Sequence, residues 1–460
     1  MLPLDIFQDR IQRLNEAPIR KGDFILYWMQ QSQRAVWNHA LEYAIELANH
    51  SGQSVVVVFG VTDRYPEANL RHYTFMFEGL METRQTLARR GIRMVIRVGH
   101  PPDVAVEVSN RASAIICDRG YLRHQKEWRR ELAAAVDCPV IQVESDVVVP
   151  VEAVSEKAQY AARSIRPKIQ RLLDRYLMPI EPRPLRLDSL KMKFKDDVRD
   201  LGGGFMERLN IDRSVPAVSE HFRGGTSRAV TQLWEFIRNR LPTYHTNSNQ
   251  PQAENVSYLS PYLHFGQISP VYIALKILKA PSLLADAKEA YLEELIIRRE
   301  LAINFVEYTP AYDSYESLPN WAKQTLKRHR GDQREYQYNK KQLEAADTHD
   351  PYWNAAMKEM VHTGFMHNYM RMYWGKKILE WSKTPETGFK TTLALNNKFF
   401  LDGRDPNSYT GVSWIYGTHD RAWSERAIFG KVRYMAASGL ERKCDIQGYV
   451  DKVEKLAQKK

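Results

Sequence analysis

The chain has 460 residues, 43% of them hydrophobic and 26% charged, and carries a formal net charge of +11. This length exceeds what one hydrophobic core comfortably supports, so we expect two or more domains. The composition is that of a folded globular protein without repeats, which excludes fibrous and disordered classes, and the positive charge favours an anionic partner without identifying it.

The cysteines and the N-terminus indicate the cellular compartment in which the protein is expected. Cys117, Cys138 and Cys444 are scattered and form no CxxC pair, so we expect no disulfide framework and no metal site. The segment 1–23 is amphipathic and charged and lacks the apolar core of a signal peptide. No apolar run approaches the roughly 20 residues that span a bilayer. We therefore expect no secretion and no membrane contact, and a location in the cytoplasm or nucleoid, or in the nucleus of a eukaryote.

In the first third of the chain, strand-like segments alternate with helix-like segments. Short β-branched or apolar runs predict strands at 24–29, 54–61, 92–98, 112–118 and 139–144. Amphipathic stretches predict helices between them, at 35–49, 69–90, 102–111 and 124–136. This alternation predicts a parallel, Rossmann-like sheet covered on both faces, whose ligands bind beyond the carboxyl ends of the strands. No GxGxxG or GxxxxGK[ST] motif is present, so neither a dinucleotide nor an NTP site is indicated.

From about residue 150 to residue 225 the alternating pattern breaks down, which marks a long connector. Prolines and glycines cluster in it, namely Pro167, Pro179, Pro182, Pro184, Gly202, Gly203, Gly204, Gly224 and Gly225. A basic stretch at 163–175 predicts a helix within it. Because the connector exceeds ordinary loop lengths, we expect it to wrap over a domain surface. The predicted limits are 20–180 for the α/β domain, 181–225 for the connector and 226–460 for an all-helical domain.

The remainder of the chain is helical in pattern. Apolar residues at a period of 3.6 predict helices at 227–240, 270–280, 285–308, 354–361, 366–381, 385–396 and 422–437. The predicted fold class is therefore α/β plus all-α. Three segments of this half carry residue types suited to chemistry.

The first segment is NVSYLSPYLHFGQISP, which places Ser257, Ser260 and Ser269 around Pro261 and Gly266. Hydroxyls and free backbone N–H groups at the start of a helix suit phosphate binding. An ordinary capped helix start explains the same pattern.

The second segment is MHNYMRMYWGKKILEW. On a helix, Asn368, Arg371 and Trp374 share one face, and Trp381 lies seven residues beyond Trp374 in nearly the same direction. Trp353 lies in the preceding segment. Indoles on one face form either a packed helix seam or a series of steps for electron transfer, since indole is readily oxidised.

The third segment runs from Leu401 to Trp423. Asp402 is placed to pair with an arginine, and Trp414 and Trp423 offer flat surfaces close to the basic side chains of Arg421, Arg426, Lys431 and Arg433. Basic residues interleaved with aromatic ones suit phosphate contact and base stacking. A solvated basic face over an aromatic core is the alternative.

Several motifs match one family together. They are YWMxxSQR (27–34), VVVVFGVTD (55–63), YAARSIRPKI (160–169), SPYLHFGQIS (260–269), EELIIRRELAINF (293–305), THDPYWNAAM (348–357) and LDGRDPN (401–407). Over nearly its whole length the chain resembles the photolyase and cryptochrome family, and within it the class II cyclobutane pyrimidine dimer (CPD) photolyases. The resemblance implies an N-terminal antenna domain and a C-terminal domain that binds FAD and DNA.

The activity implied is a carbon–carbon lyase reaction. Excited FADH⁻ transfers an electron to a dimer flipped out of double-stranded DNA, and the cyclobutane ring splits. The resemblance also implies FAD as cofactor and leaves the antenna chromophore open, with a deazaflavin, a folate, a second flavin or none compatible. We expect the protein to act on DNA as a monomer.

The resemblance assigns roles residue by residue. The residues matching FAD contacts are Tyr244, Ser257, Tyr258, Leu259, Ser260, Gln267, Asn368, Arg371 and Asp402. Arg371 and Asp402 match the pair flanking the flavin ring, and Asn396 matches the residue facing flavin N5. Glu294 matches the carboxylate that contacts the dimer and protonates it.

Other matches concern electrons and DNA. Trp374, Trp353 and Trp381 match the photoreduction series, running from beside the flavin to the surface, and Trp414 matches an aromatic wall of the dimer pocket. Residues matching DNA contacts are Arg421 and Arg433. Arg298 departs from the family, because some members have a second tryptophan there. Its guanidinium is placed to stack on the dimer, to bind a phosphate or to pair with a nearby acid.

Other functions remain open at this point. A blue-light photoreceptor without repair activity shares the ancestry, but Glu294 and Trp414 favour repair. Repair of (6-4) photoproducts requires a histidine pair that we do not find around Glu294 or Asn396. Without the resemblance, the chain is a helical DNA-binding module fused to an α/β domain.

Overall fold

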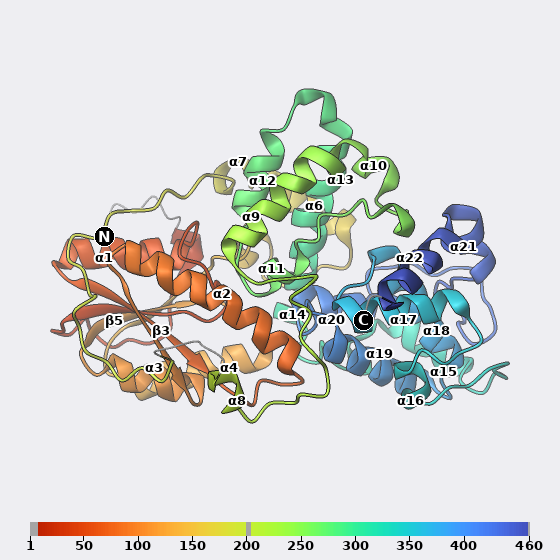
Figure 1. Ribbon diagram of the computed structural model, residues 1–460, viewed down its shortest axis with the longest axis horizontal. Coiled ribbons are helices and arrows are strands. Elements are labelled where there is room, and N and C mark those ends of the chain that lie inside the picture. Colours follow the sequence, from red (N-terminus) through yellow and green to blue (C-terminus); the bar gives the residue numbers. More distant parts are fainter. Residues whose placement is uncertain (1–7, 199–203, 459–460) are drawn as a thin grey trace.

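The computed structural model describes residues 8–198 and 204–458. Residues 199–203 of the predicted connector, Gly202 and Gly203 among them, lie outside the described residues. A sheet with its covering helices forms one part of the protein, on the left in Figure 1, and a larger mass of helices forms the other. The predicted fold class, α/β plus all-α, is confirmed. Among the described residues, no helix has the length and apolar character needed to cross a membrane.

The sheet has six strands in the order β1-β6-β5-β2-β3-β4. Their bounds are β1 (Ile11–Arg13), β2 (Phe24–Trp28), β3 (Ser54–Val61), β4 (Arg93–Val98), β5 (Ala112–Asp118) and β6 (Val140–Val143). All neighbouring strands are parallel except β1, which pairs antiparallel with β6. The sequence does not predict β1, because its three residues, IQR, contain no apolar run.

Successive side chains of a strand point to opposite faces of the sheet, and helices cover both faces. Phe24, Leu26 and Trp28 of β2 pack on one face with α3 (Pro101–Ser109) and α4 (Arg123–Ala135). The intervening Ile25 and Tyr27 pack on the other with α1 (His39–Ser51) and α2 (Leu70–Arg89). Figure 1 shows these two helix layers on either side of the strands. Burial on both faces is why the strands read as continuous apolar runs.

Helices build the rest of the described chain. The α-helices are α5 (Val151–Val154), α6 (Ala162–Gln170), α7 (Leu173–Tyr176), α8 (Gly204–Glu207), α9 (Thr226–Glu235), α10 (Tyr244–Asn247), α11 (Ser260–His264), α12 (Pro270–Leu278), α13 (Ala285–Leu292), α14 (Arg299–Tyr308), α15 (Asn320–Arg328), α16 (Lys340–Glu344), α17 (Pro351–Thr363), α18 (Asn368–Trp381), α19 (Pro385–Phe399), α20 (Pro406–Ile415), α21 (Ala437–Lys443) and α22 (Ile446–Gln458). Two π-helical segments are η2 (Phe236–Arg240) and η6 (Glu293–Arg298). Short 3₁₀ turns are η1 (Gln8–Arg10), η3 (Leu241–Thr243), η4 (Pro251–Ala253), η5 (Ser282–Leu284) and η7 (Tyr315–Ser317).

One predicted helix, 422–437, is wrong. The chain there folds back on itself, with the Trp423 amide donating to Lys431 O at 2.9 Å and with Arg426 and Gly430 exchanging two backbone hydrogen bonds. Ile428 and Gly430 adopt positive φ angles of 69° and 54°, which a helix does not tolerate. The apolar spacing that suggested a helix instead places Phe429 and Val432 in the core beneath α15.

Three other predicted helices are irregular, and the first of them, 227–240, ends in the π-helical η2. The basic stretch 163–175 forms α6 and α7, separated by a turn. The stretch 285–308 is continuous, but its middle widens into η6. Periodicity alone does not distinguish a π turn inserted into a helix, because it shifts the face by a single residue.

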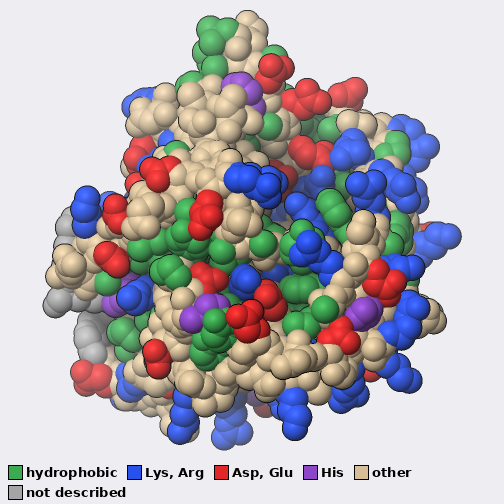
Figure 2. All heavy atoms as spheres, turned by 90° about the vertical axis from the view of Figure 1, so that its right-hand side faces the viewer, with side chains coloured by type: hydrophobic (Ala, Val, Ile, Leu, Met, Phe, Trp, Pro, Cys, Tyr) green, Lys and Arg blue, Asp and Glu red, His purple; other side chains and the backbone are tan. Residues whose placement is uncertain are grey.

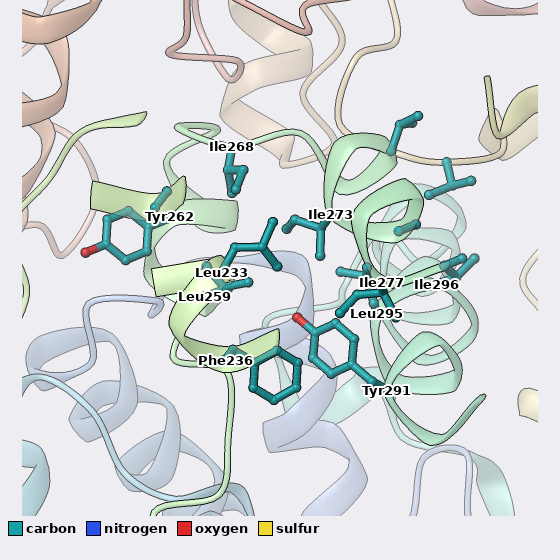
Figure 3. Packing of buried hydrophobic residues seen from close by; sticks show 14 of the residues in the cluster. Leu233, Phe236, Leu259, Tyr262, Ile268, Ile273, Ile277, Tyr291, Leu295 and Ile296 are labelled. Atoms are coloured by element: carbon teal, nitrogen blue, oxygen red, sulfur yellow. The ribbon is translucent and has the colours of Figure 1, made fainter. Parts of the chain in front are cut away.

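The largest core cluster supports η6 from below. Figure 3 shows Leu233, Phe236, Ile277 and Tyr291 packed together with Leu295 of η6. Because Leu295 and its neighbours Ile296 and Ile297 are buried in this core, the rotation of the π-helical segment is defined by packing. The side chains on its other face are thereby positioned for the site described below.

Buried polar groups join the two parts of the molecule. The guanidinium of Arg34 donates to Asp146 and to Gly266 O, both at 2.9 Å. Glu300 of α14 accepts from the Val148 amide at 2.6 Å. The connector runs over the sheet domain as predicted, at least before residue 199, with Asp196 contacting Arg84 at 2.6 Å. The helical site is therefore held rigidly against the sheet.

Candidate cofactor and DNA site

A largely buried ion pair joins α18 to the turn that follows α19. Arg371 of α18 donates to Asp402 Oδ2 at 3.0 Å and to Met366 O at 3.0 Å. Its guanidinium lies 4.0 Å from the ring centroid of Phe400. The other carboxylate oxygen, Asp402 Oδ1, is buried and has no hydrogen-bond partner among the described residues. An acceptor left open in this way suits a donor from a bound molecule, because burial without a partner is costly.

Asn396 lies at the end of α19, close to this pair. Its side chain donates to Asn397 Oδ1 at 2.9 Å and to Ser408 Oγ at 2.5 Å. The turn that returns the chain to Asp402 passes so near that a Cβ on Gly403 would lie 2.9 Å from Asn396 O. The glycine therefore allows Asn396 and Asp402 to share one small region.

Three buried indoles form a continuous series. The rings of Trp374 and Trp353 are parallel within 10°, with centroids 6.5 Å apart, and Trp353 and Trp381 are 5.5 Å apart. The Trp353 indole donates to Trp374 O at 2.9 Å, while the buried Nε1 of Trp374 has no partner in the described chain. Phe400 lies 6.2 Å from Trp374. The series thus begins beside the Arg371–Asp402 pair, in the order that the resemblance implies.

The resemblance predicts that the tryptophan series runs to the surface, but Trp381 does not reach it. Trp381 is only 3% exposed, because Tyr338 and His349 cover its ring at centroid distances of 5.2 and 5.4 Å. Tyr338 and His349 Nδ1 are hydrogen-bonded at 2.7 Å, and His349 stacks on Tyr336, which is 39% exposed. These three residues were missed because they lie in an irregular segment without helical spacing.

The Ser257–Ser260 segment borders a second part of the same site. Tyr258 adopts a positive φ of 55°, which turns the chain into α11 at Ser260. Arg240, at the end of η2, lies 5.1 Å from the Tyr258 ring, and its Nη1 is buried without a partner among the described residues. Asn255 Nδ2 is unsatisfied in the same way. Arg240 escaped the sequence analysis because no local motif marks it as facing inward.

Three predicted FAD contacts, Tyr244, Leu259 and Asn368, differ in their surroundings, as does Ser269 of the helix-start pattern. Tyr244 is buried against Phe236 and Tyr291. Leu259 packs in the core, and Asn368 is exposed at the start of α18. Ser269 caps α12 by accepting from the Tyr272 amide.

Gln267, a predicted FAD contact, is bound by protein groups. It is fully buried and joins the two parts of the molecule, accepting from the Gly225 amide at 2.7 Å and donating to Phe75 O at 3.3 Å. Both ends of its amide are therefore occupied by protein groups.

Glu294 lies on the outward face of η6. Its carboxyl is reached by solvent, yet surrounding protein raises its pKa by burial, and the nearby positive charge of Arg298 opposes this rise. The raised pKa favours a carboxyl that can hold or donate a proton.

Two tryptophans of the outer face are flanked by arginines. The guanidinium of Arg298 lies 5.5 Å from the Trp414 ring centroid. Trp423, which is 40% exposed, lies between Arg421 at 5.3 Å and Arg433 at 5.2 Å. Figure 2 shows Lys and Arg side chains gathered on the right of the face that the helical part presents. This combination suits contact with a nucleic acid backbone and stacking on bases.

A further cavity opens at the carboxyl ends of β2 and β3, where the sheet topology predicts a ligand. It is lined by residues of both parts of the molecule, among them Trp28, Gln30, Gln33, Tyr65, Trp128 and Arg404. Trp28 Nε1 and both amide atoms of Gln30 are buried without partners in the described chain. Among the described residues, no cluster of His, Cys, Asp or Glu is arranged to hold a metal ion.

Solved structures share this architecture. A bacterial class III photolyase from Agrobacterium tumefaciens superimposes with a TM-score of 0.73 at 17% identity, covering 94% of this chain and 87% of that chain. A cryptochrome from Synechocystis gives a TM-score of 0.71 at 16% identity, covering 94% and 88%. The protein therefore has the fold of the photolyase and cryptochrome class.

Sequence relatives define the family more closely. A protein named deoxyribodipyrimidine photo-lyase from Methanothermobacter thermautotrophicus is 50% identical over 98% of this chain and 99% of its own. One of the same name from Potorous tridactylus is 38% identical over 93% of this chain and 81% of its own. The profile described as DNA photolyase matches residues 25–186. The chain belongs to the DNA photolyase family, which confirms the resemblance.

Proposed function

We propose that this protein is a deoxyribodipyrimidine photo-lyase that splits cyclobutane pyrimidine dimers in double-stranded DNA under light. The observation that carries the proposal is the buried series of Trp374, Trp353 and Trp381, which starts beside the unsatisfied Asp402 carboxylate. The names of relatives at 38 to 50% identity over most of the chain support it.

The chemistry of the open polar atoms fits FAD. Asp402 Oδ1 is an acceptor suited to a flavin N–H, and the unpartnered donors of Arg240 and Asn255 suit the phosphate and ribityl oxygens near Ser257–Ser260. When bound, reduced FAD supplies the electron that the dimer accepts after light absorption and returns after ring opening. Arg371 offsets the negative charge of this cofactor, with Asp402 holding the guanidinium in place.

The remaining predicted residues face the flavin or the dimer. We assign Asn396 to the flavin side, fixed by Ser408, and Glu294 and Trp414 to the dimer pocket. Glu294 presents a carboxyl with a raised pKa to the carbonyl and N–H groups of the dimer. Trp414 offers its ring as a wall.

The outer face binds the DNA from which the dimer is extruded. Trp423, Arg421 and Arg433 suit backbone phosphates and the bases exposed beside the gap. Extrusion of a dimer costs less than extrusion of a normal pair, because its pairing and stacking are already impaired. We place the protein, acting as a monomer, in the compartment that holds the DNA.

The cavity beside β2 and β3 is our candidate for an antenna chromophore. Its aromatic walls and the unsatisfied Gln30 amide suit a planar ring with polar edges. The lining does not distinguish a deazaflavin from a folate or a second flavin. The absorption spectrum of the purified protein does, because each has its own bands beside those of FAD.

The test of the function is direct. The purified protein is reduced and illuminated with blue light in the presence of an oligonucleotide that contains one thymine dimer, and restored thymines are measured by chromatography. We expect repair in the light and none in the dark, and no repair of a (6-4) photoproduct. A yellow protein that photoreduces but restores no thymines would show a photoreceptor instead.

A further inference from the structure

The π-helical segment η6 allows the side chains of Glu293 and Arg298 to meet. Arg298 Nε donates to Glu293 Oε1 at 3.0 Å, although the two residues are five apart. In a regular α-helix, side chains five residues apart diverge by about 140°. The i→i+5 hydrogen bonding of a π-helix, seen here from the Arg299 amide to Glu294 O, brings them onto one face.

Glu293 is itself fixed by another element. Arg166 of α6 donates to both of its carboxylate oxygens, at 2.7 and 3.1 Å. This forked arrangement restricts the carboxylate more than a single contact does. Since Glu293 is restricted by α6, the direction in which Arg298 points is restricted as well.

The Arg298 guanidinium lies over the face of Trp414, at 5.5 Å from the ring centroid. That indole and the His419 ring form a T-shaped pair with centroids 5.9 Å apart, and His419 Nδ1 is 2.8 Å from Tyr160 O. The position of Trp414 is thus defined by α20 and by the turn that follows it. Arg298 therefore stacks on a surface that does not move freely.

The two Nη groups of Arg298 remain open. Within the part of the chain that the structure describes, they have no hydrogen-bond partner, and the side chain is 34% exposed. Glu294 lies on the same π-helical segment, close enough for the charge of Arg298 to oppose the rise of its pKa. Arg298 therefore brings unused guanidinium donors close to the Glu294 carboxyl and to the indole face of Trp414.

We propose that Glu293 and the π-helical turn aim Arg298 at the extruded pyrimidine dimer, so that Arg298 recognises the damage itself and not the DNA backbone. The inference rests on the proposed function and deepens it. A dimer presents carbonyl oxygens, which match the open guanidinium donors, and Trp414 supports the guanidinium from its ring face. Glu293 is a positioning residue in this arrangement.

The test measures binding in the dark. Dissociation constants of the FAD-containing protein are measured for duplexes with and without one thymine dimer, at a series of salt concentrations. For Arg298→Gln we expect the affinity for dimer DNA to fall about tenfold or more, as for loss of a hydrogen bond from a charged group. Affinity for undamaged DNA and the salt slope should stay unchanged.

Three comparison variants complete the design. Arg298→Lys retains the charge but not the planar fork, and we expect it to bind dimer DNA nearly as weakly as Arg298→Gln. Glu293→Gln should give an intermediate loss, because Arg298 is present but no longer aimed. Arg421→Gln serves as the phosphate-contact control, which lowers affinity for both duplexes and reduces the salt slope by about one.

The measurements distinguish recognition of the dimer by Arg298 from binding of a phosphate. If Arg298→Gln weakens both duplexes equally and reduces the salt slope by about one, Arg298 binds a phosphate and the inference is overturned. Full binding by Arg298→Lys would also overturn it, because charge alone would then suffice. Failure of the proposed function appears elsewhere, as absence of light-driven repair by the unsubstituted protein.

Discussion

The flavin-facing interior and the DNA-facing surface of the helical part use the same residue types in opposite ways. Inside, Arg371 is paired with Asp402 and stacked on Phe400, and the indoles of the tryptophan series are at most 3% exposed. Outside, Arg421 and Arg433 flank an indole that is 40% exposed, and their cation–π contacts face water.

The difference follows from the two tasks. A charge held next to a cofactor must be fixed and shielded, because electrostatic interactions are strong where water is excluded. A charge that meets a DNA backbone must exchange partners and respond to salt. Substitutions should therefore have large, specific effects in the interior and small, graded effects at the surface.

The largest effect is expected at the interior ion pair. Asp402→Asn leaves the Arg371 charge uncompensated, so we expect the free energy of unfolding to fall by about 3 kcal/mol and FAD to be lost on purification. Thermal unfolding and the flavin absorbance measure both. The matched control is Glu316→Gln, which breaks an exposed pair with Lys323 and should cost at most about 1 kcal/mol. Equal stability of the two variants would show that the Arg371–Asp402 pair contributes no more to folding than an exposed pair.

The next effect concerns the tryptophan series alone. Trp353→Phe removes the middle indole, so photoreduction of oxidised FAD should fall to the background rate while chemically reduced protein still repairs dimers. Flash photolysis and the repair assay measure the two separately. Trp321→Phe, which alters an indole packed on Gly417 outside the series, should leave photoreduction unchanged. Equal loss of repair by pre-reduced protein would mean that Trp353 is structural.

Smaller effects are expected from the arginines around Trp423. Arg421→Gln and Arg433→Gln should each weaken binding to damaged and undamaged DNA alike and reduce the salt slope by about one. Titration at several salt concentrations provides the measurement. Arg130→Gln, on α4 of the sheet domain, is an exposed control that should change neither. A damage-specific loss in either test variant would show that the surface also reads the lesion.

The smallest effect concerns pH. His329 contacts Asp332 at 2.6 Å and Glu425 at 3.1 Å, and these two carboxylates raise its pKa above the ordinary 6.5. Because the folded pKa is raised, the stabilisation is fully present below pH 6.5 and is lost as the pH rises through the raised value. Glu425 belongs to the segment that carries Trp423, so DNA affinity should decline modestly over that range.

The control for this prediction removes the titrating group. His329→Gln should show no such decline in DNA affinity when the pH is raised from about 6 to 9. A decline of the same size in the variant would mean that another group titrates, and the contact of His329 with Glu425 would then have no role in DNA binding.

Sequence patterns predicted what depends on local periodicity and on residue type. The strands 54–61 and 112–118 appear with the predicted bounds in β3 and β5, because burial on both faces demands continuous apolar runs. The pairing of Arg371 with Asp402 and the order of the tryptophans are also observed. Roles toward FAD and DNA remain proposals.

Other structural features could not be predicted from the sequence, and the structure shows why. The segment 422–437 has helical spacing, but backbone contacts with its own far end and with Thr325 override it. Arg240 looks like any surface arginine until the fold buries one of its nitrogens. Gln267 lies in a family motif, yet the fold uses its amide to join the two parts.

By itself, the sequence determined the class of fold, the division into a sheet part and a helical part, and the family, since these follow from periodicity and from motifs read along the chain. Only the tertiary structure decided which polar atoms remain open, that Trp381 is covered, and that Arg298 lies between Glu293 and Trp414. The physical reason is that burial and orientation depend on packing between distant segments, which local spacing does not encode.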